Sequence, residues 1–155
     1  MSMSLPKGSK LFGKCLCGTI EFEISGESSR VYQCHCSLCR KASGSSSNSA
    51  MLVNSNGFSW LNGENHIMKY STKSGFKSEF CKKCGSPVPN KSGNGKLYWV
   101  PAGLLEEPID KKIAVHLYVD SSASWDKAFL DDSVPKHSEM PEQLEFLKLL
   151  HEKNS

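Results

Sequence analysis

The chain has 155 residues, a length typical of one domain that can bury a hydrophobic core without disulfides. Its net charge is only +3, and its basic residues are scattered, so the charge does not indicate nucleic-acid binding. No apolar run approaches the roughly 20 residues of a membrane span, and Met1 to Lys10 lack the apolar core of a secretory signal. We therefore expect one cytoplasmic domain over residues 1–155 that binds neither nucleic acid nor membranes.

Alternating apolar and polar residues predict strands along most of the chain. The alternation is clear in Thr19 to Ile24, where Ile20, Phe22 and Ile24 share one face. Shorter runs that favour strands follow at 50–53, 66–70, 76–80 and 97–101, and a clean alternation returns at 113–119. The segments between them are rich in Gly, Asn and Ser and too short for parallel crossovers, so we expect antiparallel pairing.

The end of the chain carries the one helical pattern. Pro141 suits a first helical turn, and Leu144, Leu147 and Leu150 recur every third residue. The expected fold is therefore mainly β, an antiparallel sheet domain with a short C-terminal helix over about 141–152.

Seven cysteines are the most informative part of the composition. An odd number cannot all pair as disulfides, and a reducing cytosol would not keep such pairs oxidised. Spacings of two and three residues are instead typical of metal ligands. The three clusters are Cys15 and Cys17, then Cys34, Cys36 and Cys39, then Cys81 and Cys84.

The first and last clusters look like two halves of one site. Gly18 and Gly85 each follow a cysteine, where a positive φ would let a backbone N–H point at the thiolate. Joined, the two pairs make a closed four-sulfur shell, the arrangement of a structural zinc. Its four ligands would be Cys15, Cys17, Cys81 and Cys84.

The middle cluster supplies three ligands, which leaves one position open, as expected of a reactive zinc. His35 lies between two of these cysteines, and a strand would turn it to the opposite face, so we interpret it as a packed residue or as one that supports a ligand from behind. The alternative is that a remote fourth ligand closes the site. Candidates for that ligand are His66, His116 and His137.

Three thiolates overcompensate the two charges of zinc, so an ion held this way is a poor activator of water. Soft ligands favour binding of a further sulfur, which indicates chemistry at a thiol or thioether of the substrate. His137 and Glu139 match the H-x-E of zinc deaminases, but no cysteine pair follows them and no proline precedes Cys81, so we interpret that match as chance.

Three motifs make the chain resemble the glutathione-dependent formaldehyde-activating enzyme family, whose zinc-binding fold is similar to the Mss4 module. They are CLCGTIEF from Cys15, CHCSLCRKASGS from Cys34 and FCKKCGSPV from Phe80, and the match runs from about residue 13 to 140. The resemblance implies two zinc ions per chain, a structural one on the outer four cysteines and a catalytic one on Cys34, Cys36 and Cys39. It also implies a carbon–sulfur lyase that condenses formaldehyde with glutathione, its co-substrate, to S-hydroxymethylglutathione.

A glutathione-like thiol would also need partners for its carboxylates and amides. Arg40 directly follows the third cysteine and could bind a carboxylate bidentately, while we interpret Lys41 as a solvated charge. Gln33, Ser45 and Asn48 are further candidates for hydrogen bonds to the ligand.

A second hypothesis assigns the chain to a different functional class. The same fold is compatible with a non-catalytic zinc module that recognises a protein or chromatin partner. A thiol-plus-aldehyde assay separates the two hypotheses.

Overall fold

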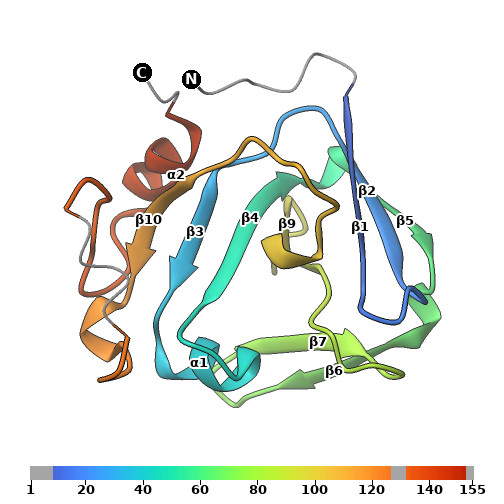
Figure 1. Cartoon of the computed structure of the whole chain (residues 1–155), viewed down its shortest axis with the longest axis horizontal. Coiled ribbons are helices and arrows are strands. Elements are labelled where there is room, and N and C mark those ends of the chain that lie inside the picture. The colour runs from blue at the N-terminus through green and yellow to red at the C-terminus, as the bar shows by residue number, and fades with distance from the viewer. Residues whose placement is uncertain (1–8, 127–131, 153–155) are drawn as a thin grey trace. The chain divides into compact units, whose positions relative to one another are not determined.

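The computed structural model describes residues 9–126 and 132–152, which divide into two compact units (Figure 1). Of these residues, the first unit contains Ser29–Ala50, 111–126 and 132–152, and the second contains 9–28 and Met51–Asp110. Two segments with sequence-based expectations lie outside the described residues. They are residues 1–8, expected to carry no secretory signal, and 127–131, within the family-like region.

The first unit is built on strands β3 (Val31–Cys34), β10 (Ile113–Leu117) and the start of β4 (Asn48–Asn54), which lie side by side in Figure 1. β4 continues into the second unit from Met51. β4 is antiparallel to β3, whereas β10 is parallel to it. Pairing was expected to be antiparallel throughout, because neighbouring connections are short. That argument does not apply to β3 and β10, since Met51–Asp110 of the second unit separates them in sequence and leaves ample chain for a crossover.

Two helices complete the first unit, with the 3-10 turn η4 (Val119–Ser121) after β10. α1 (Ser37–Ser43) follows β3 directly, and Gly44 ends it in the left-handed conformation that glycine adopts without strain. α2 (Gln143–His151) confirms the predicted C-terminal helix and packs against β10. It begins two residues after Pro141, because the carbonyl of Glu142 accepts its first hydrogen bond, from Phe146 N–H.

The buried face of α2 differs from the leucine stripe that the sequence suggested. Leu150 is fully buried, but Leu144 is 81% exposed, and the second buried residue is Phe146. Phe146 lies four positions before Leu150, which matches the helical period better than a spacing of three. Its ring meets that of Tyr32 edge-on, with 5.2 Å between centroids, and thereby joins the helix to β3.

The second unit contains an antiparallel sheet of β1 (Lys10–Lys14), β2 (Glu21–Ser25) and β5 (Phe58–Asn62), in that order. Ile20, Phe22 and Ile24 are buried on one face, as the alternation predicted. A Cβ at Gly13 would lie 2.2 Å from the ring of Phe22, so only glycine lets β1 approach β2 at this point.

The rest of the second unit is a set of hairpins and short turns. β6 (Ile67–Ser71) pairs with β7 (Lys77–Cys81), and β8 (Asn90–Lys91) pairs with β9 (Leu97–Pro101), which follows β4 in the strand order. The 3-10 turns are η1 (Ser55–Gly57), η2 (Glu64–His66) and η3 (Ala102–Leu104). These strands confirm the four short runs that the sequence predicted, with ends shifted by up to two residues. None of the helices in the described parts of the chain is long and apolar enough to span a bilayer.

Candidate metal centres

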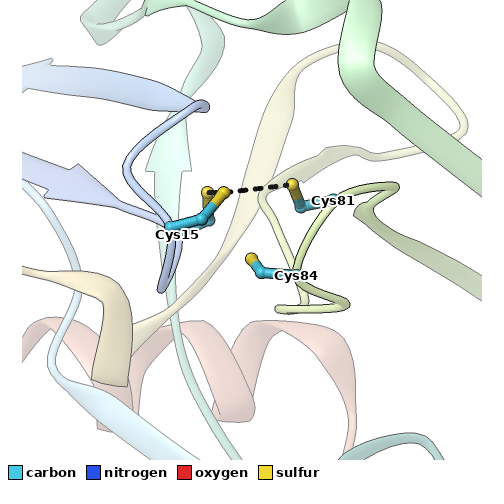
Figure 2. Close-up of side chains that lie close together, drawn as sticks. Cys15, Cys81 and Cys84 are labelled. Atoms are coloured by element: carbon cyan, nitrogen blue, oxygen red, sulfur yellow. Dashed lines mark hydrogen bonds between the residues drawn. The ribbon is translucent and has the colours of Figure 1, made fainter.

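The second unit brings together four cysteines from two distant segments. Cys15 and Cys17 lie in the turn after β1, and Cys81 and Cys84 lie at the end of β7. Their four sulfur atoms all lie within 4.8 Å of one another. Figure 2 shows the side chains of Cys15, Cys81 and Cys84 pointing toward a common centre. We call this group the four-cysteine cluster.

The sulfur separations fit a tetrahedral metal ion. A tetrahedron with zinc–sulfur bonds of about 2.3 Å has edges of about 3.8 Å. Cys15 Sγ lies 3.6 Å from Cys17 Sγ, and Cys17 Sγ lies 3.9 Å from Cys81 Sγ. A disulfide would require about 2.05 Å, and all four cysteines are free. The donor set and its spacing therefore suit one zinc ion.

The two halves of the four-cysteine cluster share a turn geometry. Gly18 and Gly85 adopt φ of 79° and 78°, which confirms the positive φ expected at both positions. Their own N–H groups donate to the carbonyls of Cys15 and Cys81 and close the turns. The sulfur atoms accept hydrogen bonds from other backbone amides. Ile20 N–H donates to Cys15 Sγ at 3.3 Å, and Lys83 N–H donates to Cys81 Sγ at 3.4 Å.

The cluster extends from the core of the second unit toward solvent. Cys15 and Cys81 are buried with Ile20 and Val88, whereas Cys17 is exposed. Burial raises the pKa of the Cys15 thiol to about 11, so that a thiolate there needs a cation nearby. The hydroxyl of Ser86 lowers the pKa of Cys84 to about 5. A bound cation would offset the unfavourable burial of charge at Cys15.

The first unit holds the other three cysteines within one short segment. Cys34 ends β3, Cys36 caps the N-terminus of α1, and Cys39 lies in its first turn. The sulfur of Cys36 accepts a hydrogen bond from Cys39 N–H at 3.3 Å. All three sulfur atoms lie within 4.8 Å of one another. We call this group the three-cysteine cluster.

No fourth metal-binding side chain joins the three-cysteine cluster among residues 9–126 and 132–152. A hydrogen bond with Cys39 lowers the pKa of Cys34 to about 6, and the same bond, together with burial, raises the pKa of Cys39. The donor set suits a soft divalent metal with one position left for a ligand.

His35 is packed away from the sulfur atoms although it lies between two of them in sequence. Its Nδ1 lies 3.2 Å from Asp126 Oδ2, and its Nε2 lies 3.0 Å from His116 Nδ1. All three residues are buried. Burial lowers the pKa of His35, with Asp126 acting in the opposite direction. His35 is therefore part of a buried polar chain rather than of the metal-binding group.

The other histidines considered as a remote ligand also lie outside the group of sulfur atoms. His116 belongs to the buried chain just described. His137 pairs with it through the backbone, donating its N–H to the His116 carbonyl at 3.1 Å. His66 is in the second unit, with its Nδ1 3.1 Å from Asn65 Oδ1.

Two of the expected substrate contacts lie next to the three-cysteine cluster. Arg40 follows Cys39 in α1, and its Nε donates to the Ser121 carbonyl at 3.1 Å. This bond holds the guanidinium by one edge and leaves its other nitrogens for a ligand. Asn48 is paired directly with Cys34 across β3 and β4, so both side chains project from the same face of the sheet.

The other two expected contacts are placed less favourably. Gln33 precedes Cys34 in the strand and so projects from the opposite face, where its Nε2 donates to Ser49 Oγ at 3.0 Å. Ser45 lies exposed after Gly44, and its N–H donates to the Arg40 carbonyl at 3.3 Å.

Sequence reasoning missed two residues at this site, Tyr118 and Asp126. Tyr118 is the one non-glycine residue with positive φ in the described chain, and it directly follows Leu117, which is paired with Cys34. Both belong to the HLYVDSSASW segment and its continuation, which the sequence marked as a motif without assigning a role.

The described chain is thus a mainly antiparallel β framework with two groups of cysteines, each of which could hold a metal ion. A family model described as glutathione-dependent formaldehyde-activating enzyme matches residues 10–121. The chain therefore belongs to this family, which confirms the resemblance seen in its motifs. No curated protein matches the sequence. A crystal structure of a protein from Rhodobacter sphaeroides has the same fold, with a TM-score of 0.54 and 20% identity over 81% of this chain and 99% of the other.

Proposed function

We propose that the protein is a zinc-dependent carbon–sulfur lyase that interconverts glutathione plus formaldehyde with S-hydroxymethylglutathione. The observation that carries the proposal is the three-cysteine cluster, whose three sulfurs suit one metal ion and which no fourth side chain completes in the described chain. Membership of the family supports the choice of glutathione and formaldehyde. Seven free cysteines suit a reducing compartment, so we place the enzyme in the cytoplasm.

The reaction needs a thiolate and a positioned aldehyde. Zinc at the three-cysteine cluster would supply one function, keeping the incoming thiol deprotonated near neutral pH. In the forward direction the substrate sulfur forms a bond to the carbonyl carbon, the C=O electron pair moves onto oxygen, and that oxygen takes a proton. The reverse direction breaks the same C–S bond and returns thiol and aldehyde.

The side chains around the three-cysteine cluster would bind and orient the thiol. Arg40 follows Cys39, and its guanidinium nitrogens other than Nε have no hydrogen-bond partner among residues 9–126 and 132–152, so they could bind a glutathione carboxylate. Asn48, on the same face as Cys34, offers both a donor and an acceptor to a peptide amide. The four-cysteine cluster would hold a second zinc whose closed shell contributes folding energy without chemistry.

Metal analysis and an assay on the same preparation test the proposal. We expect two zinc ions per chain and faster exchange between formaldehyde and S-hydroxymethylglutathione by NMR than in buffer. The matched control is Cys36→Ser, which should remain folded, keep one zinc and lose the catalysed exchange. A wild-type protein with two zinc ions and no effect on the exchange would instead favour a non-catalytic zinc module with a macromolecular partner.

A further inference from the structure

Three polar side chains of the first unit form one buried chain at the residue that joins Cys34 to Cys36. His35 Nδ1 lies 3.2 Å from Asp126 Oδ2, and His35 Nε2 lies 3.0 Å from His116 Nδ1. His35, His116 and Asp126 are all buried. Both ring nitrogens of His35 are therefore held by protein groups away from water, which fixes the orientation of the ring.

The backbone of His35 is held by the same strand that supplies His116. His35 N–H donates to the Leu117 carbonyl at 2.8 Å, and Leu117 is paired with Cys34 in the parallel register of β3 and β10. His116 directly precedes Leu117 in β10. This strand thus contacts His35 twice, through a carbonyl oxygen and through a ring nitrogen.

A fixed His35 determines the relative placement of two sulfur atoms. Cys34 and Cys36 are its neighbours in sequence, so the two backbone angles of His35 set how the peptide units on either side of it are oriented. Cys39 joins the group because its N–H donates to Cys36 Sγ at 3.3 Å. All three sulfur atoms lie within 4.8 Å of one another. Contacts among protein groups alone therefore bring the three sulfur atoms together.

Organisation of ligands before binding raises the affinity of a metal site. A metal that must first order its ligands loses binding free energy to the conformational entropy of the chain, whereas a site already in the binding geometry does not. Groups outside the coordination shell that orient metal ligands typically change metal affinity by about 10- to 100-fold. The four-cysteine cluster belongs to the other unit and therefore provides an internal reference.

We propose that His35, His116 and Asp126 are positioning residues that organise the three-cysteine cluster for a soft divalent metal. They act through the backbone on either side of His35 and not as ligands, since all three lie outside the group of sulfur atoms. The proposal rests on zinc binding by the three-cysteine cluster, as proposed above, and does not depend on the reaction that follows.

Competition for zinc with a chromophoric chelator gives the first test. Asp126→Ala removes one contact of His35 and should weaken zinc binding at the three-cysteine cluster by at least about 10-fold, while the zinc of the four-cysteine cluster is retained. Asp126→Asn keeps the size of the side chain and an oxygen acceptor for His35, so its affinity should stay within about threefold of wild type. An unchanged affinity in Asp126→Ala, or an equal loss in both variants, would overturn the positioning role.

A second comparison separates positioning from a general loss of stability. Leu150→Ala shortens a fully buried side chain of α2 in the same unit and should lower the urea midpoint at least as much as Asp126→Ala. Its affinity for zinc at the three-cysteine cluster should nevertheless match wild type, because Leu150 is not part of the buried chain. A loss of zinc affinity in Leu150→Ala as large as that in Asp126→Ala would overturn the proposal.

Cobalt spectroscopy reports the geometry of the site itself. Cobalt is loaded at the three-cysteine cluster after mild chelation, while zinc on the four-cysteine cluster remains spectroscopically silent. His116→Phe should weaken and shift the visible cobalt bands relative to wild type, and unchanged bands would overturn the role of His116.

The same measurements distinguish this proposal from the lyase function. A wild type whose metal affinity depends on Asp126 but which catalyses no exchange would refute the lyase function and keep the positioning role. A wild type that catalyses the exchange, with a zinc affinity that Asp126→Ala leaves unchanged, would refute only the positioning role. A wild type that binds no metal at the three-cysteine cluster would overturn both.

Discussion

His35 and His116 form a buried pair in the first unit, with His35 Nε2 3.0 Å from His116 Nδ1. The other nitrogen of His35 lies 3.2 Å from the carboxylate of Asp126, so three side chains from separate segments share one polar chain. Its members are all buried and their contacting atoms lie within 3.2 Å of one another, and such proximity lowers the cost of burying polar groups. Because His35 lies between Cys34 and Cys36, the pair also anchors the backbone that carries two sulfur atoms.

Removing this hydrogen bond should destabilise the protein. His116→Phe keeps a ring of similar size but leaves a buried nitrogen of His35 without its partner, at a cost of about 1–3 kcal/mol. Urea unfolding measures the change. His66→Ala, outside any buried network, is the control and should change stability by less than about 0.5 kcal/mol. Equal stability of the two variants would show that the histidine pair contributes nothing to the fold.

The two cysteine clusters should respond differently to substitution. Cys81→Ser should unfold or aggregate the protein, because the four-cysteine cluster joins segments far apart in sequence and its metal contributes folding energy. Cys36→Ser should leave a folded domain with one zinc fewer, since the three-cysteine cluster spans only a few residues of chain. Circular dichroism and zinc analysis measure both effects. Equal loss of folding in both variants would contradict this division of roles.

Arg40 should contribute to the binding of glutathione. Arg40→Ala should weaken it by about 1–3 kcal/mol, the scale of a lost charge-assisted hydrogen bond, with zinc content unchanged. Lys41→Ala removes the same charge one residue further along the exposed surface of α1, and is the control. Titration with glutathione and with uncharged 2-mercaptoethanol shows whether the loss of affinity comes from the carboxylates. Only glutathione has carboxylates that Arg40 could bind, so only its affinity should fall. An unchanged affinity for glutathione would remove Arg40 from the site.

Substitutions of Asn48 and Gln33 should differ in their effect on the affinity for glutathione, because the two side chains project from opposite faces of the sheet. Asn48→Ala should weaken glutathione binding by about 1 kcal/mol, since its amide lies on the face of Cys34. Gln33→Ala should leave affinity unchanged, because its side chain bonds Ser49 on the other face. Calorimetry decides between them, and a larger loss in Gln33→Ala would reverse the assignment.

Gly63 should tolerate no side chain. It adopts φ of 81°, and a Cβ there would lie 2.1 Å from the Thr19 carbonyl oxygen, two residues beyond Cys17. Gly63→Ala should therefore cost at least about 2 kcal/mol through backbone strain and collision. Gly93→Ala is the matched control, since nothing lies within 4 Å of its Cβ position. Thermal unfolding compares them, and a Gly63→Ala variant as stable as Gly93→Ala would contradict the expected strain.

Local patterns alone predicted a good part of the fold. The alternation around Ile20, Phe22 and Ile24 predicted a half-buried strand, because successive side chains of a strand project from opposite faces. No comparable periodic pattern in the sequence marked β1, β3, β5 or the helix α1. β3 is short and buried on both sides, so its residues do not alternate, and α1 has only seven residues, too few for a helical period.

The sequence by itself determined the family and the grouping of its cysteines, because ligand spacing and turn glycines are local properties that neighbouring residues encode. Only the tertiary structure decided which side chains surround the three-cysteine cluster. His116 and Asp126 contact His35, which lies between two of its cysteines, because β10 returns beside β3 after Met51–Asp110 of the second unit has intervened. A strand pairing across that distance depends on packing of the complete chain, and no local period or spacing records it.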